Sequence, residues 1–567
     1  MNSKNREPSG ITLDPENWSE LRALGHRMLD DMIDYIEHVR ERPVWQPIPQ
    51  AARERFRAEL PLGPTDLHEA YDEFSRYVAP YTSGNVHPGF MGWVHGGGTA
   101  VGMLADMLAA GLNANLGGRD QMPIEVERQI VEWARSMFSF PAGASGVFVT
   151  GTSTANLLAV LIARTAALGR QVRQTGVAAK GGKLRAYTSA DAHVCITQAM
   201  EISGLGSDAL RRIPTDAAHR MDVSALRRAI AEDRAAGLVP FMVAGTAGTV
   251  DTGAIDDLVA LADLCAEEHV YFHIDGAFGA LAVWSAELAP LVKGIERADS
   301  IAFDFHKWAQ VPYDAGFLLA RDGKLHRATF ASPAAYLRRE ARGLAAGSPW
   351  PSEYGPDLSR GFRALKTWFT LKTFGTERLG AVIARTCALA KYLERRVLAE
   401  PQLELLAPVP LNIVCFRYVS FDELLAGADI ISLHVPSLPE THHLLNAEAF
   451  ARMKNGVVVI NTSRGELIET GALIQALTSG KVAAAGLDVL PDEPMIREEA
   501  ELIHSIFNKE HDLRNLVATH VLLRMRNVVI TPHSAFNTRE AVGRIVETSA
   551  ANIAAFLAGH PQNIVDR

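Results

Sequence analysis

Short apolar runs alternate with longer amphipathic stretches over most of this sequence. The first amphipathic stretch, from residue 12 to about 42, has one apolar face spaced for a helix, made by Leu21, Leu24, Met28, Met32 and Ile36. The proline-rich residues 43–64 predict an ordered connector after that helix.

From residue 84 onward, strand-like runs and helical patterns take turns. The helical patterns include 154–168, 363–374 and 379–397. The predicted strands are 146–150, 184–188, 239–245, 270–274, 300–303, 316–320 and 411–418. This alternation predicts an α/β fold with a mostly parallel sheet covered by helices.

A second alternation of predicted strands and helices begins near residue 419, where the first one ends. Its predicted strands are 428–435, 456–461, 483–489 and 527–530, and its predicted helices are 447–452 and 471–478. The rhythm is that of another parallel sheet, but the series lacks a recognisable first strand. The sequence therefore predicts a second, incomplete α/β segment.

Composition narrows the possible partners. The chain has 567 residues, a length that allows about three to four domains, and 48% of its residues are hydrophobic. Its 56 Lys and Arg against 65 Asp and Glu give a net charge of −9, which disfavours nucleic acid and anionic membranes as partners. The four cysteines form no CxxC pair, and no apolar signal or membrane-length segment is present. We expect a soluble, cytoplasmic, globular protein.

Lys307 follows a predicted buried strand in the string SIAFDFHKW. Lysine amines form Schiff bases with carbonyl compounds, and pyridoxal 5′-phosphate (PLP) is the commonest biological aldehyde for this chemistry. A single lysine after a strand is usually a solvated loop residue. The prediction of a PLP site therefore depends on finding its other parts.

Three further strings supply those parts. Asp275 ends a predicted strand in HIDGAFG, where a carboxylate can pair with a pyridinium nitrogen. Thr152 and Ser153 lie between a strand and a helix start, where backbone N–H groups and hydroxyls suit a phosphate. His193 follows another strand and could stack on a flat ring. Taken alone, each of these residues could equally be a turn residue, a helix cap or a core histidine. The prediction of a PLP site therefore depends on their occurring together.

Residues 12–418 resemble the group II PLP-dependent amino-acid decarboxylases, in the aromatic-L-amino-acid decarboxylase-like branch. The matching strings are HPGFMGWVHG at 87–96, LADMLAAGLNAN at 104–115, TSTAN at 152–156, HIDGAFG at 273–279, HKW at 306–308 and SRGFRALKTW at 359–368. The resemblance implies a fold type I large domain at 86–365, after an N-terminal helical segment at 1–85. A small C-terminal domain would start at 366–418 and be truncated. The resemblance also implies a twofold homodimer.

The same resemblance assigns roles by position. Lys307 would form the Schiff base, Asp275 would bind the pyridine nitrogen, and His193 would stack over the ring. The remaining cofactor contacts would come from the phosphate-side residues and the opposite ring face, namely Thr152, Ser153, His306 and Ala277.

The substrate side rests on four aromatic or imidazole residues. Tyr336 matches the mobile-loop tyrosine that protonates the product carbon, and a tyrosine rather than a phenylalanine favours simple decarboxylation over aldehyde synthesis. His87, Phe90 and Trp93 would form a wall suited to an indole or phenyl ring, although a packed aromatic cluster explains the same residues.

From about residue 419 to 567, the chain resembles the D-isomer-specific 2-hydroxyacid dehydrogenases. The matching strings are HVPSLPET at 434–441, VVVINTSRGELIE at 457–469, AAGLDVLPDEP at 484–494 and VVITPHSAFNT at 528–538. This resemblance implies that Arg464 binds a substrate carboxylate and that His533 is an acid/base, with Glu493 tuning its pKa. No GxGxxG string precedes the segment. We interpret it as a partial Rossmann-like, NAD-binding segment.

The leading prediction is PLP-dependent decarboxylation of an L-amino acid, aromatic by its wall residues, to the amine and CO2. The alternatives are a catalytically impaired fusion, dehydrogenase-like activity or NAD binding by the tail, and a tail that serves as an interaction module. We predict no metal site, because His269 and His273 lie on a predicted strand, too far apart to share a metal.

Overall fold

The computed structural model describes residues 12–178, 181–332, 340–347, 349–400, 402–418, 420–435, 437–491 and 521–531. The chain divides into two compact units. The first comprises Met1–Ile48, Ala58–Ala399 and Leu405–Phe416, and the second comprises Pro49–Arg57, Glu400–Glu404 and Arg417–Arg567. Among the described helices, none has the length and apolar character needed to cross a membrane.

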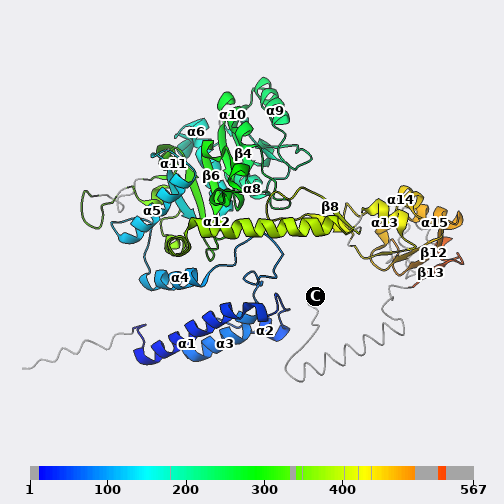
Figure 1. The fold of residues 1–567 in the computed structure, drawn as a ribbon, viewed down its shortest axis with the longest axis horizontal. Coiled ribbons are helices and arrows are strands. Elements are labelled where there is room, and N and C mark those ends of the chain that lie inside the picture. Colours follow the sequence, from blue (N-terminus) through cyan, green and yellow to red (C-terminus); the bar gives the residue numbers. More distant parts are fainter. Residues whose placement is uncertain are drawn as a thin grey trace, which may run out of the picture. The chain divides into compact units, whose positions relative to one another are not determined.

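A seven-stranded sheet forms the centre of the first unit (Figure 1). Its strands are β1 (Ser145–Val149), β2 (Leu184–Ser189), β3 (Leu210–Ile213), β4 (Val239–Thr246), β5 (Tyr271–Asp275), β6 (Ser300–Asp304) and β7 (Gly316–Ala320). Their order is β1-β7-β6-β5-β4-β2-β3. Only β7 runs antiparallel to its neighbours, β1 and β6. The prediction of an α/β fold with a mostly parallel sheet is confirmed.

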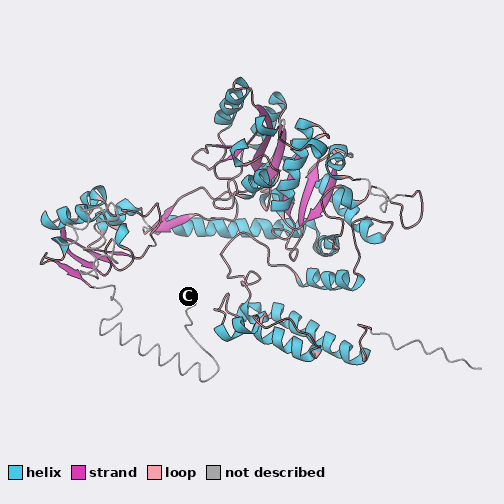
Figure 2. Ribbon diagram, turned by 180° about the vertical axis from the view of Figure 1, so that it is seen from behind, coloured by secondary structure: helices cyan, strands magenta, loops and turns pink. Residues whose placement is uncertain are grey.

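Helices pack on both faces of this sheet, as the ribbon in Figure 2 shows. In β7, Phe317 and Leu319 join one apolar core while Leu318 and Ala320 join another, which is the period-two pattern of a strand buried on both faces. The helices of this unit, beyond its N-terminal pair, are α4 (Ala100–Leu112), α5 (Met122–Met137), α6 (Thr152–Leu168), α7 (Val172–Thr175), α8 (Cys195–Ile202), α9 (Val223–Ala235), α10 (Leu258–Glu268), α11 (Gly323–Phe330) and α12 (Arg363–Leu398).

Two N-terminal helices, α1 (Trp18–Glu37) and α3 (Leu67–Tyr77), are joined by polar contacts. The Tyr71 hydroxyl donates to an Asp31 carboxylate oxygen at 2.6 Å. The predicted connector 43–64 contains the short helix α2 (Gln50–Arg55). Proline disfavours helix interiors, but residues 50–55 contain none.

The long helix α12 is interrupted at Gly375, whose φ of 69° is not helical. The predicted strand 411–418 is wrong over most of its length, because only β9 (Phe416–Tyr418) is a strand there, paired with β8 (Leu403–Leu405). Leu411 and Ile413 instead pack against the core of the first unit. Their apolar character reflects this burial rather than sheet pairing.

The second unit has its own parallel sheet, in the order β10-β11-β12-β13. Its apolar core includes Val459, Leu473 and Val482, each at most 1% exposed. Its elements in the tail are α13 (Phe421–Gly427), β10 (Ile430–Leu433), α14 (Ala447–Arg452), β11 (Val457–Asn461), α15 (Thr470–Thr478), β12 (Val482–Leu487) and β13 (Val528–Ile530).

Candidate cofactor site

Polar residues gather where β5 and β6 end and where α6 begins. Asp275 is the last residue of β5, and Asp304 is the last residue of β6. The loop from β1 into α6 comes close to β7, since a Cβ on Gly316 would lie 2.4 Å from the Gly151 Cα. The carboxyl ends of parallel strands are the usual place for ligands in α/β proteins.

Asp275 is a nearly buried carboxylate, only 5% exposed. Its Oδ2 accepts a hydrogen bond from Asn156 Nδ2 at 3.0 Å, and its Oδ1 accepts one from the Ala277 N–H at 3.2 Å. A carboxylate held in this way suits the ring nitrogen of a pyridinium. The sequence analysis missed Asn156, whose only signal was its place in the string TSTAN.

Asp304 joins the lysine to the loop before α6. Its Oδ1 accepts a hydrogen bond from the Thr152 N–H at 2.8 Å, and its Oδ2 lies 3.4 Å from Lys307 Nζ and 3.6 Å from His306 Nε2. The Lys307 side chain is 22% exposed, so its amine remains accessible. The sequence analysis also missed Asp304, which stands three residues before the lysine in the same string.

His306 is held in a defined orientation beside the lysine. The Ala315 N–H donates to His306 Nδ1 at 3.1 Å, and Tyr313 packs against the ring. Burial is the largest cause that lowers the pKa of His306. The neutral ring then carries its proton on Nε2, the nitrogen that faces Asp304.

The loop before α6 has the features of a phosphate site. Thr152 is the first residue of α6, where free N–H groups and the helix dipole attract anions. The Thr152 hydroxyl oxygen is buried and has no hydrogen-bond partner among the described residues, while Ser153 is exposed. An orphaned buried hydroxyl at a helix N-terminus fits a phosphate ester, so these residues fit PLP.

His193 and Ala277 lie at the same edge of the sheet. His193 is exposed just before α8, and the Cys195 N–H donates to its Nδ1 at 3.2 Å. Cys195 Sγ is 3.6 Å from Asp275 Oδ2, which places this turn beside the carboxylate. The structure thus brings His193, Ala277 and Asp275 together.

The string 87–96, which contains the predicted substrate wall, reaches the lysine segment at its last residue. The Gly96 N–H donates to the His306 carbonyl at 3.2 Å, which aligns the 87–96 string with the lysine segment. Phe90 and Trp93 form an edge-to-face pair with centroids 4.6 Å apart, and Trp93 is 57% exposed. The His87 ring accepts from the Gly89 N–H. Tyr336 lies outside the described residues.

The tail residues are only partly described. Arg464 is exposed in the loop after β11, where its guanidinium donates to the Ser463 carbonyl at 2.7 Å. Glu493 and His533 lie outside the described residues. His269 was wrongly assigned to a strand, since it caps the C-terminus of α10 with a φ of 53°. Within the described ranges, no group of His, Cys, Asp and Glu is arranged to hold a metal ion.

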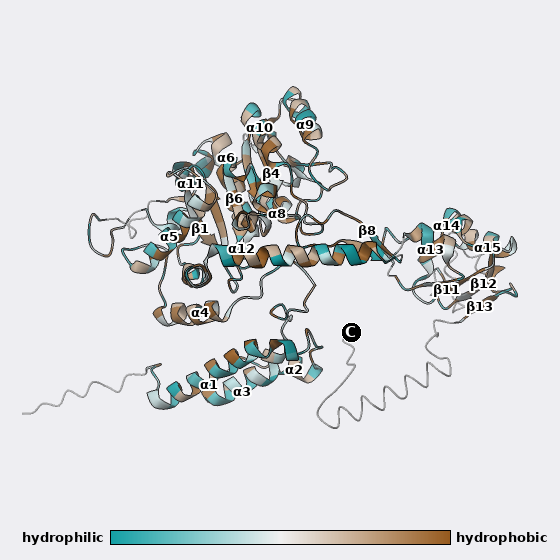
Figure 3. Ribbon diagram, in the orientation of Figure 1, coloured by the Kyte–Doolittle hydropathy of each residue, from teal (hydrophilic) through white to brown (hydrophobic). Residues whose placement is uncertain are grey.

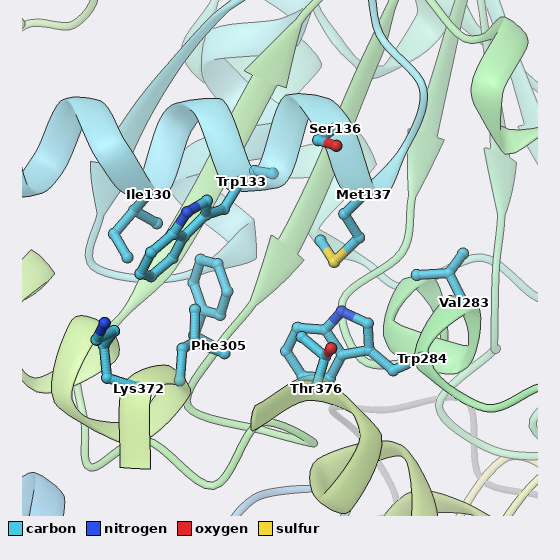
Figure 4. Close-up of a pocket in the computed structure, with 11 residues that line it drawn as sticks. Ile130, Trp133, Ser136, Met137, Val283, Trp284, Phe305, Lys372 and Thr376 are labelled. Atoms are coloured by element: carbon cyan, nitrogen blue, oxygen red, sulfur yellow. The ribbon is translucent and has the colours of Figure 1, made fainter. Parts of the chain in front are cut away.

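A separate cavity of about 530 Å³ lies between α5, α12 and the 3₁₀ helix η5 (Gly279–Trp284) (Figure 4). Trp133, Met137 and Trp284 line it. Phe305 also points into it, whereas its neighbours Asp304 and His306 contribute to the polar cluster. This cavity is therefore distinct from the candidate cofactor site.

Comparison with known proteins agrees with this geometry. The pyridoxal-dependent decarboxylase conserved domain matches residues 49–419. The chain belongs to this family. It is 33% identical to an aromatic-L-amino-acid decarboxylase of Bacillus atrophaeus, over 84% of this chain and 98% of that protein. It is 32% identical to a histidine decarboxylase of Drosophila melanogaster, over 72% of this chain and 49% of that protein.

Solved decarboxylases show the same fold. The Oryza sativa TDC structure with PLP and tryptamine matches with a TM-score of 0.66 and 26% identity, over 74% of this chain and 87% of that one. Mouse CSAD also matches with a TM-score of 0.66 and 26% identity, over 71% of this chain and 84% of that one. The predictions of a fold type I decarboxylase, a carboxy-lyase that uses PLP, are confirmed.

A second family matches the end of this decarboxylase chain. The NAD-binding domain of D-isomer-specific 2-hydroxyacid dehydrogenases matches residues 369–535, which confirms the predicted resemblance of the tail. The match begins inside α12, so its first 30 residues form a helix of the first unit. The strand, glycine loop and helix that open a dinucleotide-binding fold are therefore not formed there.

Proposed function

We propose that this chain removes CO2 from an aromatic L-amino acid and that Lys307 is the residue that binds PLP. The observation that carries the proposal is the set of contacts around Asp304, which holds the Lys307 amine beside the start of α6. The aromatic substrate is supported by the Phe90–Trp93 pair, in which Trp93 is exposed, and by the names of the relatives. A tryptophan decarboxylase structure with L-tryptophan shares the fold.

Each residue has a task in the proposed reaction. PLP, when bound, supplies an electron sink for the electron pair left by the departing CO2. The Lys307 amine would hold the cofactor through its aldehyde. Asp275 keeps the ring nitrogen protonated, and Thr152 and Ser153 hold the phosphate.

The other proposed roles concern the ring faces and the proton. His193 and Ala277 would contact opposite faces of the ring, and His306 would support the lysine. Tyr336 delivers the proton to the carbon that loses CO2. Phe90 and Trp93, with His87, contact the substrate side chain.

We further propose a cytoplasmic homodimer. Helix α4 is mostly apolar around its circumference (Figure 3). Four of its apolar residues are 36–64% exposed, namely Leu104, Met107, Leu108 and Leu112. A second copy that covers this face would remove it from water. The four cysteines, which form no disulfide, suit a reducing compartment.

The tail keeps a second candidate function. The dehydrogenase-family match favours NAD binding by the segment 419–567, in which Arg464 would meet a carboxylate. The missing glycine loop counts against hydride transfer by this segment alone. We therefore propose the segments 1–85, 86–365 and 366–418 as the decarboxylase and the tail as a partial nucleotide domain.

The proposed function is tested by the visible absorbance of the purified protein with PLP. We expect the wild type to show a band that Lys307→Ala lacks, because only an amine at that position binds the aldehyde covalently. Lys293→Ala, which removes an exposed lysine, is the matched control and should keep the band.

Release of CO2 from L-tryptophan, L-tyrosine, L-phenylalanine, L-histidine and L-glutamate then identifies the substrate class. We expect at least a hundredfold loss of release in Lys307→Ala and none in Lys293→Ala. A Lys307→Ala spectrum identical to that of the wild type would remove the basis of the proposal. Release from glutamate alone would overturn the aromatic substrate.

A further inference from the structure

A buried chain of side-chain hydrogen bonds ends at Asp275. Ser300 Oγ, on β6, lies 2.8 Å from His273 Nδ1, on β5. His273 Nε2 lies 2.8 Å from Asn156 Oδ1, on α6, and Asn156 Nδ2 lies 3.0 Å from Asp275 Oδ2. The first three residues are 0% exposed. The chain thus connects three elements and reaches the proposed pyridine partner.

The direction of each bond follows from the groups involved. Burial lowers the pKa of His273 to about 4, so its ring is neutral at pH 7 and has a single N–H. Asn156 turns its Nδ2 toward the Asp275 carboxylate and toward Cys195 Sγ, at 3.1 Å, so both amide hydrogens are used. Its Oδ1 can only accept, and therefore His273 donates from Nε2 and accepts from the Ser300 hydroxyl at Nδ1.

We propose that Asn156 and His273 are positioning residues that fix the plane of the Asp275 carboxylate for the ring nitrogen of PLP. This inference rests on the proposed function of the same site. Asn156 holds one carboxylate oxygen, and the Ala277 N–H holds the other. The carboxylate is thus held at both oxygens, and Cys195 Sγ, 3.6 Å from Oδ2, further restricts its rotation.

The chemistry of an amide explains why an asparagine serves this purpose. An amide donates a hydrogen bond without adding a charge, so Asp275 keeps its full negative charge for the pyridinium. A lysine or arginine in its place would neutralise that charge. His273 and Ser300 determine which way the amide faces, because a donor at Nε2 excludes the flipped amide.

The same unit contains a matched pair that lacks this connection. His326 is also 0% exposed, and its Nδ1 lies 2.8 Å from Ser145 Oγ. Burial lowers its pKa to about 4 as well. Its Nε2, however, faces the Tyr354 carbonyl rather than a side chain at the site. His326→Gln therefore has the structural cost of His273→Gln without the link to Asp275.

The test is the dissociation constant of PLP from the apoprotein, measured by fluorescence quenching, together with the pH titration of the absorbance band of the bound cofactor. We expect about a tenfold weaker affinity in Asn156→Ala, the usual effect of losing a hydrogen bond to a charged group. His273→Gln should weaken it severalfold, and His326→Gln should leave it within twofold of the wild type. The midpoint of the titration should move in the Asn156 and His273 variants only.

A near-isosteric variant guards against simple misfolding. Asn156→Asp keeps the side-chain volume but places a second carboxylate beside Asp275, so it should weaken PLP binding more than Asn156→Ala at neutral pH. If Asn156→Ala does not fold, Asn156→Asp and Ser300→Ala decide the question.

The two proposals fail in different ways. Wild-type protein that binds no PLP would overturn the proposed function, and this inference with it. Wild-type protein that binds PLP, with Asn156 and His273 variants that bind it equally well, would overturn only the positioning role. A loss in His326→Gln as large as that in His273→Gln would show a structural effect and would also overturn it.

Discussion

The Asp304 carboxylate connects residues from two distant parts of the chain. It contacts Thr152, which lies 152 residues earlier, and the Lys307 amine three residues later. The sequence predicted Lys307 and Thr152 as separate parts of a site, each from its local string. The contact between them could not be predicted, because it depends on β6 lying close to the start of α6 in space.

Asn156 was missed for a related reason. In the sequence it is one polar residue in the first turns of an Ala- and Leu-rich helix, where it resembles any exposed position. Only the structure shows that this face of α6 is turned inward, so that Asn156 is 0% exposed and meets His273 and Asp275. Site residues that belong to a recognisable motif could thus be predicted from the sequence. Residues whose role depends on being buried next to the site could not.

The buried histidine His326 predicts a dependence of stability on pH. Burial lowers its pKa from 6.5 to about 4, so folding favours the neutral ring. The neutral, buried ring makes its full contribution to the free energy of unfolding above pH 6.5. This contribution is lost as the pH falls toward 4, because the unfolded state then binds a proton that the folded state does not. We expect urea midpoints to fall through this window and the fall to be shallower in His326→Gln. An equally steep fall in that variant would contradict this assignment.

At the scale of elements, the close approach of β7 to the loop before α6 shapes the site. Gly316 leaves no room for a side chain, since a Cβ there would lie 2.4 Å from the Gly151 Cα. Apolar periodicity predicted both elements, β7 and α6, but not that they touch. The misplaced strand 411–418 has the same origin, because an apolar run indicates burial without saying against what.

We expect Gly316→Ala to displace the start of α6. The clash is with backbone, so overpacking should cost about 1–3 kcal/mol of unfolding free energy, measured by urea denaturation. Affinity for PLP should fall as well, because Thr152 moves with the loop. Gly361→Ala is the control, since a Cβ there meets nothing within 4 Å. Equal PLP affinity in both variants would contradict the link between β7 and the loop before α6.

At the scale of the molecule, the described part of the tail has an apolar core of its own, and the two parts of the chain match two different families. The buried residues of the tail form a cluster of their own, separate from those around the seven-stranded sheet. The sequence predicted this division from the restart of the strand–helix rhythm near residue 419. It could not predict that α12 would be shared by both family matches, since the helix continues the first unit to Leu398.

Because the cores are separate, a chain ended at Tyr418 should keep the PLP absorbance band and the dimer mass of the full-length protein. Light scattering and the visible spectrum of both forms test this. A truncated chain that is a monomer, beside a full-length dimer, would show that the tail is an oligomerisation module. Loss of the band on truncation would show that the decarboxylase core needs the tail.

The position of β7 also has a consequence for how the protein is made. Among the strands that the structure describes, β1 pairs only with β7, whose residues Gly316–Ala320 come much later in the chain. Roughly 170 residues separate the two strands, which a ribosome takes on the order of ten to thirty seconds to add. During that interval β1 is an apolar strand without its partner. An unpaired strand edge on a growing chain favours aggregation, so the nascent protein carries this risk until residues 316–320 have been made.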